Sequence, residues 1–475
     1  MIGSRKRLSA LLMILVSLTA LTYYHRYPTG DDAWFAEQSY WLQQQGVIRS
    51  EFFRGVLGWE NQLLVSHKGF LLLGAGLIRL FGHGLLTVQF VGLLSFGALV
   101  AELIYYVRRR ETTAWSWSLL AILVLIFSNR VLIRLSFENR PELLLAALGF
   151  GSFLCLRTGK PSIWTSVLAG VLAGLAVLGH LNGVIYLVAG FATLLYLRQY
   201  KPAIAFAVAG GLTSLLYFAD VALAPNGFAV WAYQFRHDPA TQEAFGWGSK
   251  LRVMLTYPKL FFESPEQAAL SLLLVFSLWQ QRKQLTQLPV FLRAYSIALV
   301  VAFWLITKHG SGTYQPLFIP FMVALVYELY RLRPFRDRAL YVVLGAYFVI
   351  GLYGTVEIIY QNLSQTYLPV AYRKLRPVLP ADQVGFVPLT FFFNEYERYP
   401  RLLCSENYGF HARPATDPTA DMVRWARQNK VGFILMDYQY RPVAFYPKPG
   451  TARLGDYRLT YFNGRFAVYR SLAGL

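Results

Sequence analysis

The sequence predicts an α-helical polytopic membrane protein with a small α/β domain at its C-terminal end. Of the 475 residues, 55% are hydrophobic and 15% are charged, which gives too many apolar runs for a soluble protein of this size. The net charge is +20, but the basic residues mostly fall in short clusters between the apolar runs, as they do in the cytoplasmic loops of membrane proteins. We therefore expect no binding to nucleic acid. The two cysteines, Cys155 and Cys404, lie in separate regions and predict no disulfide.

The first helix is expected to anchor the chain. A basic cluster at residues 5–7 precedes an uncharged run at 8–24, which is close to the minimum length that spans a bilayer. A cleaved signal peptide is the alternative, but no small-x-small site closes the run. We therefore expect an uncleaved helix with its N-terminus in the cytoplasm. Residues 25–87 would then form an extracytoplasmic loop, in which the short apolar segment 69–81 suits an interfacial helix better than a span.

The remaining spans follow from the apolar runs, and the basic cluster after every second run sets their direction. We expect them at residues 88–107, 117–133, 143–156, 164–178, 184–197, 203–218, 268–279, 294–307, 316–330 and 339–359, with a polar loop at 219–266. Together with the first helix, these runs predict about 11 transmembrane helices. The odd number and the charge asymmetry both place the C-terminus outside the cell.

The composition changes near residue 362 to that of a small soluble domain. We therefore expect a transmembrane domain at 1–361 and an extracytoplasmic α/β domain at 362–475. Asp417 is suited to cap a helix at 418–428, and residues 431–436 read as a strand. The runs 458–462 and 465–469, which flank an Asn-Gly pair, predict a hairpin.

Two adjacent carboxylates, Asp31 and Asp32, follow the first span at the outer edge of the membrane. They could be solvated loop acids, they could hold a divalent metal ion, or one of them could act as a general base. No cluster of His or Cys accompanies them, so the metal question stays open. The pair therefore needs a partner elsewhere in the chain before it indicates a function.

That partner is expected in the loop 128–142, between the third and fourth spans. Arginines on the outer side run against the positive-inside tendency. This loop holds three arginines and two glutamates: Arg130, Arg134, Arg140, Glu138 and Glu142. Each arginine alone could reach toward lipid headgroups. Beside an acidic pair they favour a site that binds phosphate and handles protons.

Other outward polar residues could contribute to the same site. A glycine-spaced turn at 307–314 would let backbone amides approach a phosphate, although an ordinary interhelical loop is the alternative. A basic pair at 67–68 precedes the segment 69–81, and a histidine at 180 ends the fifth span, where a hydrogen-bonding role is more typical than catalysis. The further candidates for binding the donor phosphate and sugar are His67, Lys68, His180, Lys308, His309 and Tyr314.

The ordered set of motifs resembles the GT-C superfamily of membrane glycosyltransferases, in particular the branch with protein O-mannosyltransferases, the lipid A aminoarabinose transferase and rhizobial galacturonosyltransferase-like proteins. The family pattern P-D-E-x-x-Y-A-E is matched by GDDAWFAE at 30–37, and an R-P-D-like element by Arg140-Pro141-Glu142. A Lys-Pro-Pro-like element reads His-Lys-Gly at 67–69, without its prolines, and a K-x-x-x-Y-x-x-P-like element matches residues 308–316 loosely. The resemblance covers residues 1 to about 360, by order and topology.

The resemblance implies transfer of a sugar from a polyprenyl-phosphate donor to an acceptor glycan, lipid or protein on the extracytoplasmic face, within the bacterial inner (plasma) membrane. An inverting displacement of phosphate needs one general base and cations for the departing charge. Asp31 matches the first acid of the family pair and is the expected base, while Asp32 and Glu142 would orient substrate or Asp31. The expected phosphate ligands are Lys68, Arg134, Arg140 and Lys308.

Two other classes of function compete with this one. A transporter or lipid flippase would place ionisable residues or broken helices near the middle of the bilayer. Most predicted spans have no central charge, and the unusual charges gather at the outer edge, which favours chemistry at the membrane surface. A noncatalytic scaffold whose tail binds a partner is the third class, because the region from residue 362 onward is basic.

Overall fold

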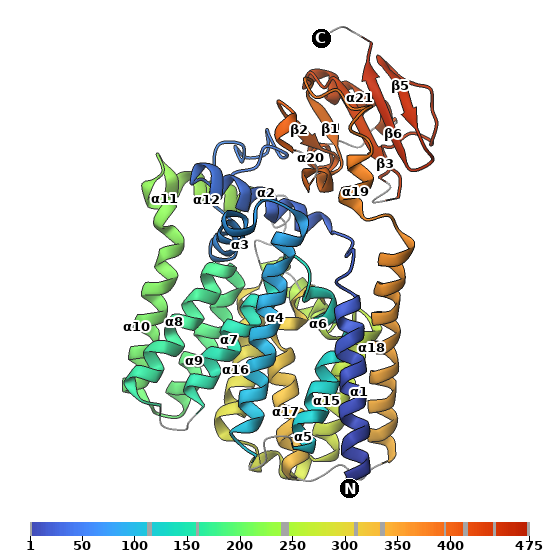
Figure 1. Ribbon diagram of the computed structural model, residues 1–475. Coiled ribbons are helices and arrows are strands. Elements are labelled where there is room, and N and C mark those ends of the chain that lie inside the picture. Colours follow the sequence, from blue (N-terminus) through green and yellow to red (C-terminus); the bar gives the residue numbers. More distant parts are fainter. Residues whose placement is uncertain are drawn as a thin grey trace.

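The computed structural model describes residues 2–111, 116–157, 161–238, 247–307, 312–332, 338–393, 396–411, 417–439 and 443–472. A helical bundle carries the N-terminus at one end, and a small domain that contains the C-terminus covers the other end (Figure 1). The larger helices of the bundle are α1 Ile2–Leu21, α4 Leu85–Arg108, α5 Trp117–Phe127, α7 Glu142–Leu156, α8 Ile163–Gly179, α9 Val184–Tyr196, α10 Tyr200–Leu215, α15 Pro265–Gln280, α16 Val290–Ile306, α17 Ile319–Leu332 and α18 Arg338–Ser364.

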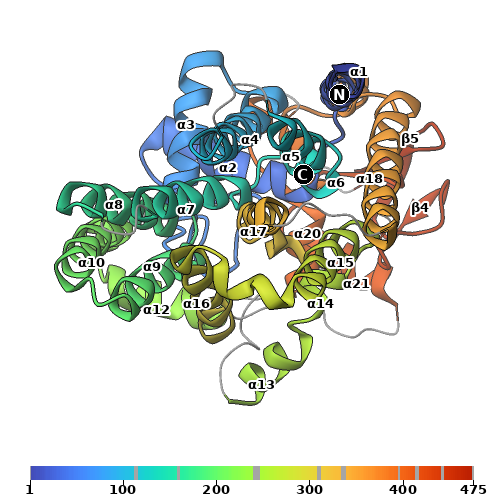
Figure 2. The same ribbon diagram turned by 90° about the horizontal axis from the view of Figure 1, so that it is seen from below.

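Membrane helices are present in this bundle. Within the described ranges, Leu85–Arg108, Tyr200–Leu223 and Arg338–Arg373 are each long and apolar enough to cross a bilayer, and five shorter apolar helices accompany them. Every predicted span overlaps one of the larger helices, but the number of membrane crossings stays a prediction. Viewed from the N-terminal end, α17 lies in the middle of the bundle, with α8, α9 and α10 on one side and α15 and α18 on another (Figure 2).

The structure divides two segments that the sequence treated as single units. The expected span 117–133 is divided, because Asn129 accepts a hydrogen bond of 3.0 Å from the backbone N–H of Leu132 and so caps a separate short helix, α6 Arg130–Leu135. In the described part of the expected polar loop 219–266, the chain forms the short helices α11 Ala219–Leu223, α12 Gly227–His237, α13 Trp247–Thr256 and α14 Lys259–Phe262. Among the described residues of the bundle, 3₁₀ turns also lie at η1 Leu181–Gly183, η2 Leu216–Phe218, η4 Arg282–Gln287 and η5 Gly312–Leu317.

The loop after α1 forms a layer across the end of the bundle that faces the C-terminal domain. It contains α2 Gly30–Gln45 and α3 Lys68–Phe81, and α3 covers the segment that the sequence predicted as a short helix. Glu37 of α2 is fully buried and accepts hydrogen bonds from the Oγ of Ser50 at 2.5 Å and from the backbone N–H groups of Glu51 and Phe52 at 2.6 and 3.0 Å. This one carboxylate therefore fixes the connection between α2 and α3.

The C-terminal domain is a six-stranded mixed sheet with flanking helices. The strand order is β2-β1-β3-β6-β5-β4, with β1 parallel to β2 and β3 and the remaining pairs antiparallel. Its strands are β1 Gly385–Val387, β2 Leu402–Cys404, β3 Phe433–Asp437, β4 Arg453–Leu454, β5 Tyr457–Phe462 and β6 Phe466–Ser471. Its helical segments are α19 Leu368–Arg373, η6 Leu389–Phe393, η7 Tyr396–Arg398, α20 Ser405–His411 and α21 Pro418–Gln428.

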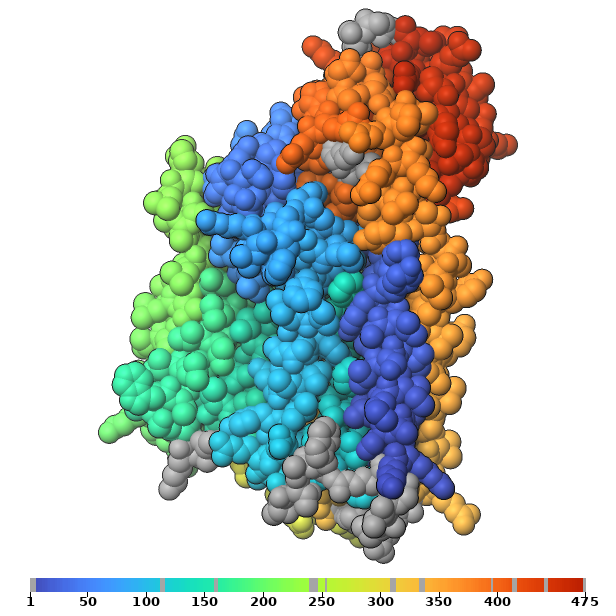
Figure 3. Space-filling view, viewed as in Figure 1, coloured from blue at the N-terminus to red at the C-terminus, as the bar shows by residue number. Residues whose placement is uncertain are grey.

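The sheet packs directly on the loop after α1. Alternate residues of each strand face opposite sides, so Phe433 and Leu435 enter a core shared with the loop and α3, while Ile434 and Met436 enter a separate core under α21. The backbone carbonyl of Phe52 also accepts a hydrogen bond of 3.3 Å from the backbone N–H of Cys404 in β2. The space-filling view shows the C-terminal domain resting on the loop layer (Figure 3).

Candidate active site

The acidic pair lies in the first turn of α2. Thr29 has extended backbone and caps the helix, and its backbone N–H donates to Oδ2 of Asp32 at 2.6 Å. The side chain of Thr29 accepts in return from the backbone N–H of Asp32 at 3.4 Å, which completes a capping box. Asp32 therefore satisfies the start of its own helix, and the helix direction places Asp31 on a different side.

Asp32 also fastens α2 to the loop before α7. Its Oδ1 accepts a short hydrogen bond from the backbone N–H of Asn139, and the Nδ2 of Asn139 donates to the backbone carbonyl of Asp32 at 3.1 Å. Both residues are fully buried. The pKa of Asp32 is raised to about 7, mainly by burial and in part by the neighbouring carboxylate of Glu138, while the hydrogen bonds that Asp32 accepts act in the opposite direction. The geometry makes Asp32 a positioning residue.

Arg140 joins the two acids that face the open side of the site. Its Nη2 donates to Oε1 of Glu142 at 2.6 Å and its Nε to Oε2 at 3.2 Å, which is a two-pronged contact that fixes the guanidinium plane. The remaining Nη1 forms an ion pair with Asp31. The side chain of Asp31 is 44% exposed, against 17% for Arg140 and 4% for Glu142. Asp31 is therefore the carboxylate of this group that a substrate can reach.

The second predicted arginine, Arg134, lies in the last turn of α6, six residues before Arg140. Arg134 is 53% exposed and donates through Nε to Oε1 of the buried Glu138 at 3.0 Å. The loop passes very close to α4 at Gly92, where an added Cβ would stand 2.5 Å from the backbone oxygen of Glu138 and 2.8 Å from that of Leu135. A glycine at this point lets the loop that carries both arginines pack against the bundle.

Three aromatic side chains border the Arg140 cluster. The rings of His67 and His180 stack with centroids 4.2 Å apart, and the ring of Tyr314 meets His180 edge-on at 6.2 Å. The pKa of His180 is lowered to about 4, mainly by burial, with the carboxylate of Glu142 opposing and the charge of Arg140 adding to the shift. Burial also lowers the pKa of His67 well below its usual range, with smaller contributions from His180 and Arg140. At neutral pH both imidazoles are uncharged, so they offer ring faces and hydrogen bonds rather than positive charge.

The structure gives Lys68 a partner away from the acidic pair. Its Nζ donates to the backbone carbonyl of Tyr217 at 2.6 Å, lies 4.4 Å from the centre of the Tyr217 ring, and forms an ion pair with Asp220 of α11. These contacts fasten the start of α3 to η2 and α11. Two other predicted residues, Lys308 and His309, lie outside the described residues.

Sequence reasoning left out two residues that build the site. Thr29 stands three residues before Asp32, which is the spacing of a capping box, so its signal was present in the sequence. Asn139 gave no comparable signal, because its contact with Asp32 spans 107 residues. A third arginine of the same loop, Arg130, is occupied by ion pairs with Glu266 at 2.7 Å and Glu357 at 2.6 Å, which link α6 to α15 and α18.

A divalent metal ion does not fit the acidic pair in this arrangement. Both oxygens of Asp32 accept hydrogen bonds from N–H groups, and Asp31 is paired with Arg140. Within the ranges that the structure describes, no three side chains of His, Cys, Asp or Glu are grouped so that they could hold a metal. The side chains of the site therefore offer a carboxylate and a guanidinium cation, not a set of metal ligands.

Comparison with known proteins identifies the fold. No protein-family model and no curated protein sequence matches the chain. In structure the chain is similar to ArnT from Cupriavidus metallidurans in the apo state, with a TM-score of 0.58, 14% identity, and 98% of each chain covered. The same protein bound to undecaprenyl phosphate gives a TM-score of 0.54, again with 14% identity and 98% of each chain covered.

A second similar structure is the archaeal oligosaccharyltransferase AglB from Archaeoglobus fulgidus, in complex with an inhibitory peptide and a dolichol-phosphate. The TM-score is 0.50 at 12% identity, with 90% of this chain and 69% of that chain covered. At 12 to 14% identity these likenesses show that the chain shares the fold of ArnT and AglB, which is the fold that the resemblance to the GT-C superfamily implied.

Proposed function

We propose that this protein is an inverting membrane glycosyltransferase that moves a sugar from a polyprenyl-phosphate donor to an acceptor on the extracytoplasmic face. The observation that carries the proposal is the Asp31–Arg140–Glu142 cluster, in which a half-exposed carboxylate is held by an arginine whose plane a buried carboxylate fixes. A base for the acceptor and a cation for the leaving phosphate are the two groups that this reaction needs.

In the proposed reaction, an acceptor hydroxyl attacks the anomeric carbon of the donor sugar. The new bond from the acceptor oxygen to that carbon forms as the bond from carbon to the phosphate oxygen breaks, and the configuration at the carbon inverts. The hydroxyl proton passes to Asp31. The negative charge that develops on the departing phosphate is met by Arg140, with Arg134 as a second cation that is largely exposed. Lys308 and His309 stay candidates for the same phosphate.

The other site residues support these two groups. Asp32 sets the position of Asp31 by tying α2 to Asn139, and Glu142 sets the position of Arg140. The uncharged rings of His67 and His180, together with Tyr314, form a wall suited to the donor sugar, because ring faces and neutral hydrogen-bonding groups suit hydroxyl-rich ligands. The ion pair of Lys68 with Asp220 holds the start of α3 in place, directly after His67 of this wall. In this proposal the chain's own residues supply the base and the cations that the reaction needs.

The similar structures support the nature of the donor and the acceptor. ArnT has been seen with undecaprenyl phosphate, and AglB with a dolichol-phosphate and an inhibitory peptide. A lipid carrier keeps its tail in the bilayer and brings its phosphate to the surface, where the Arg140 cluster would meet it. We accordingly propose a bacterial inner (plasma) membrane location, with the N-terminus in the cytoplasm and the C-terminal domain outside.

The test replaces the proposed base. Asp31→Asn removes the charge with little change in size, and a general base typically accounts for about 10²- to 10⁴-fold in rate. We expect this loss in the initial rate of sugar transfer by purified protein in proteoliposomes with a polyprenyl-phosphate sugar. The matched control is Glu60→Gln, another partly buried acid of the same loop, which should keep the parental rate. Equal rates for Asp31→Asn and the parent protein would refute the assignment, and transport of the donor without transfer would indicate a flippase.

A further inference from the structure

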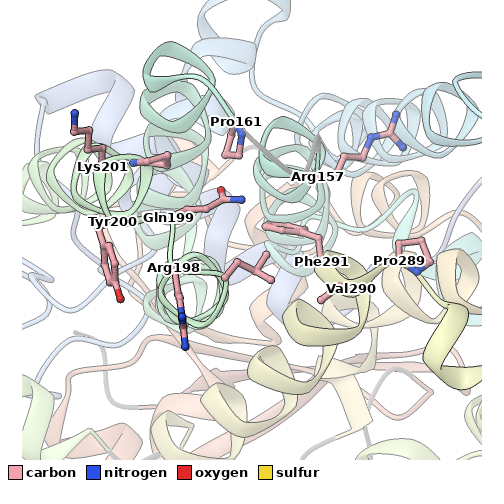
Figure 4. Close-up of a pocket in the computed structure, with 11 residues that line it drawn as sticks. Arg157, Pro161, Arg198, Gln199, Tyr200, Lys201, Pro289, Val290 and Phe291 are labelled. Carbon is pink, nitrogen blue, oxygen red and sulfur yellow. The ribbon is translucent and has the colours of Figure 1, made fainter.

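A basic cavity lies at the end of the bundle opposite the acidic site. It has a volume of about 950 Å³ and is built where α7 and α9 end and where α10 and α16 begin. Its charged lining residues are Arg157, Arg198 and Lys201, and its apolar ones include Phe291 and Pro161. In Figure 4 the three basic side chains stand around the rim, with the ring of Phe291 nearer the middle. The cavity thus has a charged rim, with the ring of Phe291 and the amide of Gln199 inside it.

The three cations of the rim have no acidic partner among the ion pairs of the described residues. The guanidinium of Arg157 lies 4.8 Å from the centre of the Tyr106 ring. Arg198 has a left-handed backbone, with φ of 57°, which turns the chain sharply from α9 into α10 and brings it close to Lys201. Both of these residues are exposed. The rim is therefore an uncompensated positive field that an anion can enter.

A second feature begins at the same lysine. An apolar groove of about 580 Å³ runs from Lys201 between α8 and α10, and it is lined by apolar side chains such as Ile163, Val167, Ala205 and Val208. The two helices approach closely at Gly170, where an added Cβ would stand 2.4 Å from the backbone oxygen of Phe206. Val208 is 55% exposed on the outside of the bundle. The groove is thus open to an acyl chain.

We propose that the cavity and the groove together bind one anionic phospholipid, with its phosphate at Arg198 and Lys201 and an acyl chain along α8 and α10. The argument is that one residue, Lys201, belongs to both features, so a single ligand that is anionic at one end and apolar along its length satisfies both. A free phosphate would use only the rim. A zwitterionic headgroup would place its own positive charge beside the three basic side chains of the rim. The predicted topology places this end in the leaflet where anionic lipids are enriched.

The experiment measures lipid retention on the purified full-length protein by native mass spectrometry. The probes are phosphatidylglycerol, phosphatidylcholine with the same acyl chains, and inorganic phosphate. Arg198→Gln combined with Lys201→Gln should lower the affinity for phosphatidylglycerol by roughly 30-fold, since each of the two cations favours anionic lipid by roughly fivefold. The matched control is Arg282→Gln with Lys283→Gln, an exposed basic pair in η4.

Three outcomes would overturn the proposal: equal retention of the two phospholipids by the parent protein, an equal loss in the η4 control, or displacement of phosphatidylglycerol by an equal concentration of inorganic phosphate. Filling the groove with Ala205→Phe should lower the affinity for phosphatidylglycerol severalfold. An unchanged affinity in this variant would also overturn the lipid assignment. Should the double variant fail to fold, Lys201→Gln alone gives the same comparison at roughly fivefold. Sugar transfer is not measured, so this result is independent of the proposed function.

Discussion

Glu142 offers the sharpest test of how the site is held. Glu142→Gln keeps the size of a side chain that is 4% exposed, but an amide can accept only one of the two hydrogen bonds that Arg140 donates at 2.6 and 3.2 Å. Its NH₂ group then faces another N–H donor. Losing one charge-assisted hydrogen bond costs about 1.5–3 kcal/mol. If the displaced Arg140 stabilises the transition state less by this amount of free energy, the rate of transfer falls by about 10- to 150-fold.

The assay is the initial rate of sugar transfer in proteoliposomes, measured with the melting temperature of each variant. We expect Glu142→Gln to weaken donor binding. In a protein that already carries Arg140→Lys, adding Glu142→Gln should have little further effect, because a lysine cannot make the two-pronged contact with Glu142. Additive losses in the double variant would contradict the coupling. A rate within twofold of the parent for Glu142→Gln, with an unchanged melting temperature, would refute the reasoning.

Three further predictions follow from the same contacts. Arg140→Ala and Lys308→Ala should raise the KM for the lipid-linked donor more than the KM for the acceptor, and equal changes would argue against a phosphate role. Burial raises the pKa of Glu37 from 4.5 to about 7. Between these two pH values the folded protein keeps a proton on Glu37 that the unfolded chain loses, so the free energy of unfolding should fall by about 3 kcal/mol as the pH rises through this range. Glu37→Gln should flatten this dependence of the melting temperature on pH. Gly92→Ala should lower the melting temperature and the rate, because its Cβ would press on the loop at Glu138.

Much of the bundle could be predicted from the sequence, because apolar runs long enough for a bilayer have few other interpretations. The helix at 418–428 was also predicted with its cap, since Asp417 accepts from the backbone N–H of Ala420 at 2.9 Å, as its position suggests. What could not be predicted was where an apolar run divides. Asn129 interrupts the run 117–133 by a local cap, and a hydropathy pattern carries no signal for such a change of direction.

The sequence predicted which site residues would meet only where a motif carried them. Asp31 and Arg140 came from separate elements of one ordered pattern, and the structure brings them together across 109 residues. Lys68 was expected at the same site by position in that pattern, but it is paired with Asp220, which is 152 residues away and belonged to no motif. The spacing of residues within a motif cannot reveal a charged partner that lies outside the motif.

The adjacent acids illustrate why one carboxylate is available and the other is not. Consecutive residues of a helix point about 100° apart, so only one of the pair can turn inward to Asn139 while the other turns toward Arg140. The capping box selects Asp32 for the inward position, because Thr29 lies three residues before it and not before Asp31. The roles are therefore set by the start of the helix. Removing the capping side chain with Thr29→Gly should loosen Asp32 first and reduce sugar transfer through Asp31 as a consequence, measured as the initial rate in proteoliposomes.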